Sequence, residues 1–161
     1  MSETSPAPTH SAARALRSGQ HVLFGLLWVI GASQAWVDAR LTGVTLVLAI
    51  GLAAWYPVGS WVAHRSAAAR AGWIWFGVLA ALWVGVVLLA PTFAWVVFPL
   101  NLLALHLLPD AAALGTVIAL TLTAISVLWP TASNPLAAVL GPTVGAVVAV
   151  GVSWGYQRII A

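Results

Sequence analysis

The chain has 161 residues, of which 62% are hydrophobic and 6% are charged. Soluble domains carry about a quarter charged residues, so this composition excludes a water-soluble globular domain and predicts an integral membrane protein. The net charge of +3 comes from six Arg against three acidic residues, with no basic stripe interleaved with aromatics, which excludes nucleic acid as a partner. Cysteine is absent, so disulfides and thiolate metal sites are excluded as well.

The N-terminal segment is rich in Ser, Thr, Pro and Ala, and we expect residues 1–18 to form a mobile cytoplasmic tail. Residues 19–161 contain six apolar stretches, each close to the roughly 20 residues that a helix needs to cross the hydrocarbon core. Lipid offers backbone groups no hydrogen-bond partners, so the predicted fold is an all-α bundle of six transmembrane helices. The predicted spans are 20–37, 41–62, 72–90, 93–108, 111–129 and 136–157.

The Arg residues in the short loops predict the orientation, because cytoplasmic loops are enriched in positive charge. Five of them fall on one side of a six-span arrangement: Arg14, Arg17, Arg65, Arg70 and Arg158. Only Arg40 falls on the other side, where Asp38 is close in sequence. We therefore expect a multi-pass protein of the plasma membrane with both termini in the cytoplasm.

The fourth predicted span combines aromatic and polar residues within an apolar helix. Its notable side chains are Phe93, Trp95, Phe98, Asn101 and His106, and Pro99 can free a backbone carbonyl. One interpretation is a pocket for a flat apolar ligand such as haem, with rings on its faces and an axial nitrogen from His106. The alternative is structural, with Asn101 bonding a neighbouring helix and His106 capping the inner interface.

Two further features are candidate contacts. Tyr56 ends the core of the second span, where a tyrosine either ligates haem iron or anchors the helix at the interface. The last span contains the pairs Gly141/Gly145 and Gly151/Gly155, whose spacing lets two helices approach closely, within one bundle or between two copies in a homodimer. Residues 1–161 contain no catalytic motif and no firm metal site, so we assign no catalytic residue.

The stretches "FAWVVFPLNLLALHLLP" at 93–109 and "LAAVLGPTVGAVVAVGVSWGYQRII" at 136–160 carry a resemblance. In layout the chain resembles the N-terminal membrane module of two-component sensor histidine kinases from high-GC Gram-positive bacteria. Some members of that family respond to haem through aromatic residues that correspond to Phe93 and Phe98. The resemblance implies a parent protein in which the last span leads into a dimerisation helix, a cytoplasmic kinase core and, through it, a response regulator.

These observations predict a sensory input module that detects a hydrophobic or membrane-associated stimulus and relays it through the last helix. A small transporter and a structural subunit of a membrane complex are the alternatives. A transporter needs polar residues along a path at mid-membrane, and Asn101, Gln34 and the hydroxyls of the fifth span are the candidates.

Overall fold

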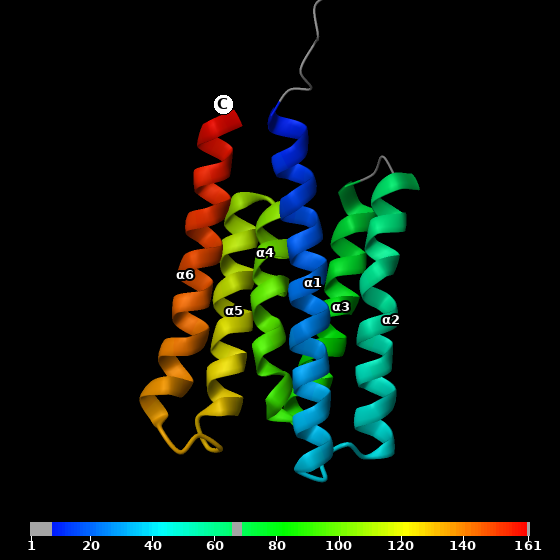
Figure 1. Cartoon of the computed structure of the whole chain (residues 1–161), viewed down its shortest axis with the longest axis vertical. Helices are drawn as coiled ribbons and strands as arrows, with labels where there is room; N and C mark the ends of the chain where they lie inside the picture. Colours follow the sequence, from blue (N-terminus) through cyan, green and yellow to red (C-terminus); the bar gives the residue numbers. More distant parts are fainter. Residues whose placement is uncertain (1–7, 66–68, 161) are drawn as a thin grey trace, which may run out of the picture.

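The computed structural model describes residues 8–65 and 69–160, and within them every regular element is helical. In chain order these are α1 (Pro8–Val37), α2 (Gly43–Arg65), α3 (Ala69–Leu89), the 3-10 helix η1 (Pro91–Val96), α4 (Val97–Leu107), α5 (Asp110–Leu128) and α6 (Pro135–Ile160). The helices run alternately down and up, so the start of α1 and the end of α6 lie at one end of the bundle, called here the terminal end (Figure 1). The all-α class is confirmed for the described residues.

The first helix is longer than expected. It begins at Pro8, so residues 8–18 belong to α1 although we placed them in the tail, while residues 1–7 lie outside the described part. A proline suits the first helical position, because it has no amide hydrogen to satisfy, and the Ala, Arg and Leu that follow are good helix formers. The predicted interruption at 38–40 falls between α1 and α2, those at 109–110 and 130–135 include the first residue of the helix that follows, and 91–92 lie within η1.

The fourth span differs from the single helix predicted at 93–108. Its first part is the 3-10 helix η1, and only the part from Val97 onward is α-helical. Pro99 has no amide hydrogen to offer the carbonyl four residues earlier, and the turn before it tightens, with the Val97 N–H bonded to the Ala94 carbonyl. The segment is therefore a turn followed by a helix of 11 residues.

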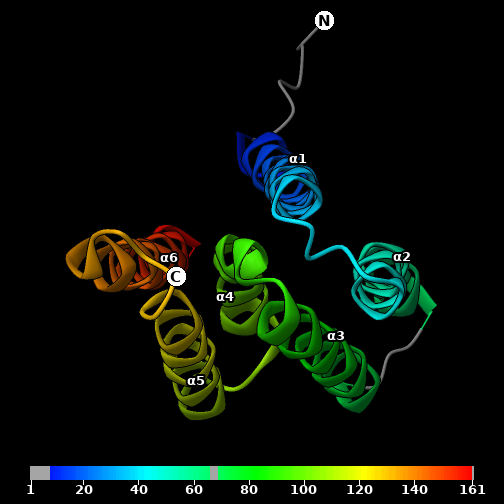
Figure 2. The same ribbon diagram turned by 90° about the horizontal axis from the view of Figure 1, so that it is seen from below.

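The segment η1–α4 lies in the middle of the bundle, packed against α1, α3, α5 and α6 (Figure 2). The helices α2 and α3 form a close pair, whereas α1 packs mainly on η1 and has little contact with α2. The largest side chains with no exposed surface, Trp83 and Phe93, lie where α3 meets η1. The core is thus centred on η1, and α1 and α2 stand apart along most of their length.

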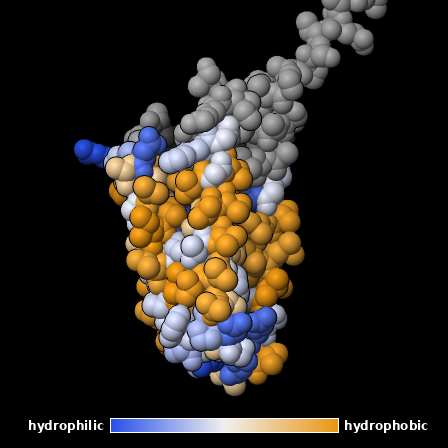
Figure 3. All heavy atoms as spheres, turned by 90° about the vertical axis from the view of Figure 1, so that its left-hand side faces the viewer, coloured by the Kyte–Doolittle hydropathy of each residue, from blue (hydrophilic) through white to orange (hydrophobic). Residues whose placement is uncertain are grey.

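The outside of the bundle is apolar. Three helical segments among the described residues are long and apolar enough to cross a membrane: Arg70–Leu89, Asp110–Leu128 and Pro135–Gly155. Only 28–33% of these windows is buried inside the protein, so most of their apolar side chains face outward. On the face with α5 and α6, a hydrophobic band separates hydrophilic residues at the two ends of the molecule (Figure 3). This surface suits a bilayer, and we conclude that the protein is a membrane protein.

Several tryptophan side chains join one helix to another through hydrogen bonds. Five of them donate their N–H to a backbone carbonyl of another element: Trp28 to Ala49, Trp55 to Trp75, Trp75 to Trp55, Trp73 to Leu107 and Trp83 to Phe93, at 2.9–3.1 Å. The reciprocal bonds of Trp55 and Trp75 join α2 to α3 at the position of Gly59, where a Cβ atom would overlap the Trp75 ring. Two hydrogen bonds and a close approach at Gly59 therefore join α2 to α3.

Candidate functional site

The three aromatic rings of the η1–α4 segment do not face a common cavity. Phe93 is fully buried against α1, where a Cβ atom at Gly31 would lie 3.1 Å from its ring. The neighbouring Thr92 hydroxyl donates to the Gly31 carbonyl at 3.0 Å, and the ring of Trp28 meets Phe93 edge-on with centroids 6.3 Å apart. Phe93 thus fixes α1 to η1.

Trp95 and Phe98 point to a different helix, α6. A Cβ atom at Gly141 would lie 3.0 Å from the Trp95 ring, and one at Gly145 would overlap the Phe98 ring. The two rings are neighbours, with centroids 5.9 Å apart. The first glycine pair of α6 therefore serves packing within the bundle, since it admits two rings from the central segment. By contrast, nothing lies within 4 Å of a Cβ atom built at Gly151 or Gly155.

Asn101 has no exposed surface and joins α4 to α5. Its amide nitrogen donates to the Thr121 hydroxyl over 3.3 Å, which is the interhelical bond expected under the structural interpretation. Its carbonyl oxygen is buried without a hydrogen-bond partner among the described residues. A buried acceptor of this kind favours rearrangements that supply a donor, so the α4–α5 contact is less stable than a fully bonded one.

His106 lies on the exposed side of α4, near the terminal end of the bundle. Its Nδ1 is 2.8 Å from the Leu102 carbonyl, so Nδ1 carries the proton and Nε2 presents its lone pair outward. This is a suitable donor for iron, but the rings of Phe93 and Phe98 face α1 and α6 and do not share a cavity with it. The described residues contain no group of three or more His, Asp or Glu that would hold a metal ion.

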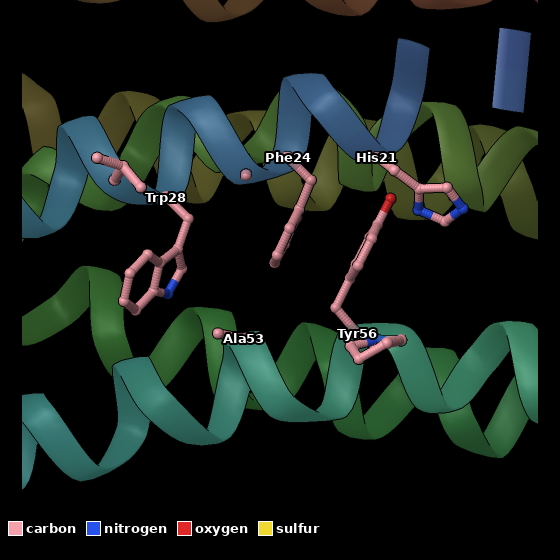
Figure 4. Close-up of a pocket in the computed structure, with 8 residues that line it drawn as sticks. His21, Phe24, Trp28, Ala53 and Tyr56 are labelled. Atoms are coloured by element: carbon pink, nitrogen blue, oxygen red, sulfur yellow. The ribbon is translucent and has the colours of Figure 1, made fainter. Parts of the chain in front are cut away.

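Tyr56 lies in a separate place, a groove of about 480 Å³ between α1 and α2. Its ring stacks on Phe24 of α1, with centroids 3.7 Å apart and planes nearly parallel, and the ring of His21 meets it edge-on at 5.5 Å. Trp28 and Ala53 line the groove further along, and Figure 4 shows Ala53 on α2 facing the space between the rings of Phe24 and Trp28. The Tyr56 hydroxyl points toward α1 beside His21.

A second groove of about 300 Å³ lies where the end of α4 and the start of α5 meet the upper part of α6. Asp110, Ser153 and Trp154 line it, together with apolar residues. Neither groove is lined by the residues predicted as a ligand site in the fourth span.

Sequence reasoning identified Tyr56 but missed its neighbours on α1. His21, Phe24 and Trp28 recur at spacings of three and four, which places them on one helical face, and this signal was available in the sequence. Their contact with Tyr56 was not predictable, because a short turn makes α1 and α2 neighbours but does not specify which of their side chains meet.

No protein-family model, curated protein or solved structure matches the chain.

Proposed function

We propose that the chain is a membrane-embedded signal-input module that spans the bilayer six times and relays a rearrangement of its bundle through α6. In this proposal both termini lie in the cytoplasm, and α6 leads into a kinase core outside this chain. The stimulus is a hydrophobic or membrane-associated molecule, for which haem remains one candidate.

One observation supports the proposal most: the first half of α6 holds the two aromatic rings of the central segment, and its other end extends past α4 and α5. Trp95 and Phe98 of the central segment sit on Gly141 and Gly145, in the half of α6 distant from the terminal end. Toward the terminal end, Gly151 and Gly155 are open, and α6 runs past the ends of α4 and α5 (Figure 1). A shift of the central segment would therefore displace the first half of α6, and because α6 is one continuous helix, its C-terminal end would move as well. A partner can contact that end, since it extends past α4 and α5.

The central segment is also suited to occupy two states. It combines a 3-10 turn with a short helix, and its buried Asn101 leaves one acceptor without a partner. It contacts α1 through Phe93 and α6 through Phe98, so a displacement at α1 would be transmitted to α6 through this segment.

The test is a chimera in which a cytoplasmic histidine kinase core is fused after residue 161 and the protein is reconstituted in vesicles. Phe98→Ala removes the ring that rests on α6 and should change autophosphorylation by about 2–30-fold, the range of typical coupling energies. Val148→Ala is the control, because Val148 is an exposed side chain of α6 and its loss leaves the Phe98 contact intact. Equal activity in both variants and the parent chimera would favour the transporter or structural-subunit alternatives.

A further inference from the structure

The groove between α1 and α2 is open toward the surroundings of the bundle. Both helices lie at its periphery, and they touch each other little, because α1 is held by η1 and α2 by α3 (Figure 2). At about 480 Å³ the groove has the size of a small-molecule site. Since the outer surface of these helices is apolar, the medium at its mouth is lipid.

The groove contains a polar group without a partner. Tyr56 is 93% buried, since its relative exposure is 7%, and its hydroxyl has no hydrogen-bond partner among the described residues. A buried hydroxyl left unbonded is unfavourable by an amount comparable to a lost hydrogen bond, so an acceptor brought into the groove gains that bond. His21 covers this hydroxyl edge-on and is itself exposed at the rim, so rotation of its side chain admits a ligand.

The depth of the hydroxyl identifies the acceptor. The ring of Tyr56 meets His21, an exposed residue at the polar start of the apolar part of α1, next to Gln20 and four residues after Arg17. In a bilayer this is the boundary between the hydrocarbon core and the headgroups, where the ester carbonyls of glycerolipids are found. Below it, toward the middle of the membrane, the groove continues between the rings of Phe24 and Trp28 over the small side chain of Ala53 (Figure 4).

We propose that this groove binds one glycerophospholipid of the bilayer. One acyl chain lies between the Phe24 and Trp28 rings, and an ester carbonyl accepts a hydrogen bond from the Tyr56 hydroxyl. The bound chain lies beside the Phe24–Tyr56 stack, which together with the Trp28–Ala49 hydrogen bond joins α1 to α2. The inference goes beyond the proposed signalling role and does not rest on it, because lipid binding is measured on this chain without a kinase core.

The test compares two phosphatidylcholines of equal chain length, one with ester and one with ether linkages, titrated onto the full chain in detergent and followed by native mass spectrometry. The diether lipid lacks the carbonyl and should bind about fivefold more weakly, the effect of one hydrogen bond. In Tyr56→Phe, which keeps the ring and loses the hydroxyl, this preference should disappear.

Two substitutions separate the groove from the surface beside it. Ala53→Leu places extra volume on the floor of the groove and should abolish retention of both lipids, whereas Ala54→Leu adds the same volume at the adjacent exposed position and should leave retention unchanged. Gly25→Leu narrows the groove from α1 and should also abolish retention of both lipids. Because Gly25 and Ala53 lie on different helices, the same loss in both variants points to the groove and not to a folding defect of one variant. Equal affinity of the wild-type chain for both lipids, or undiminished retention in Ala53→Leu and Gly25→Leu, would overturn the proposal.

Discussion

The contact between Phe98 and Gly145 gives the most quantitative prediction. In Gly145→Ala the new methyl group would overlap the Phe98 ring, which is half-buried between α4 and α6 beside Trp95. Overpacking of this kind destabilises by about 1–3 kcal/mol, because the ring or the helix must move. At Gly151 the same substitution meets nothing within 4 Å and should stabilise the helix by up to about 1 kcal/mol through its propensity.

The gain in helix propensity is common to both variants, so the overpacking at Gly145 should make them differ by about 1–3 kcal/mol in the free energy of unfolding. Reversible unfolding in mixed micelles, followed by circular dichroism, measures this difference. The comparison is well controlled, since both substitutions are Gly→Ala in one helix and differ in the presence of the ring.

A double-mutant cycle isolates the ring. Once Phe98→Ala has removed it, Gly145→Ala should no longer destabilise the protein, so the two substitutions should be strongly non-additive. If Gly145→Ala and Gly151→Ala have the same effect, or if the loss from Gly145→Ala persists without the ring, the packing of α6 on the central segment is not as described.

Three other variants test separate parts of the structure. Ala39 has φ 54° in the α1–α2 turn, a left-handed conformation that favours glycine, so Ala39→Gly should raise the free energy of unfolding by about 0.5–1 kcal/mol, and a lower thermal stability would contradict this. If Gly151 lies in the seam of a homodimer, Gly151→Leu should reduce crosslinking between copies in vesicles; unchanged crosslinking would place the seam elsewhere. In protein loaded with haem, His106→Ala should shift the Soret band if the outward Nε2 is axial, and an unchanged spectrum would remove His106 as a ligand.

The helix boundaries were largely predictable from local chemistry. Charged or proline-containing breaks interrupt the apolar stretches at 38–40, 109–110 and 130–135, and lipid leaves few structures other than helices between them. The 3-10 turn at η1 was not predicted, because Pro99 affects the turn that precedes it, and an apolar pattern does not distinguish a 3-10 from an α-helical turn.

The candidate site was only partly predictable, because the relevant partners are far apart in sequence. The spacing of Phe93, Trp95 and Phe98 suggests one cluster, but the 3-10 turn directs Phe93 to α1 and the other two rings to α6. Likewise, tryptophan often anchors a helix at the membrane interface, but in the part of the chain that the structure describes five Trp donate hydrogen bonds to another element. Whether a ring meets lipid or another helix depends on the packing of helices, which one sequence does not specify.

The six-span arrangement with both termini in the cytoplasm is the central claim, and cysteine accessibility tests it most directly. The chain has no cysteine, so single substitutions can be labelled without background. In intact cells a membrane-impermeant maleimide should label Asp38→Cys and Ser133→Cys, which lie in the turns opposite the terminal end. Ser66→Cys and Ala161→Cys should react only after the membrane is opened. Labelling of either of these two from outside, in intact cells, would contradict the proposed topology.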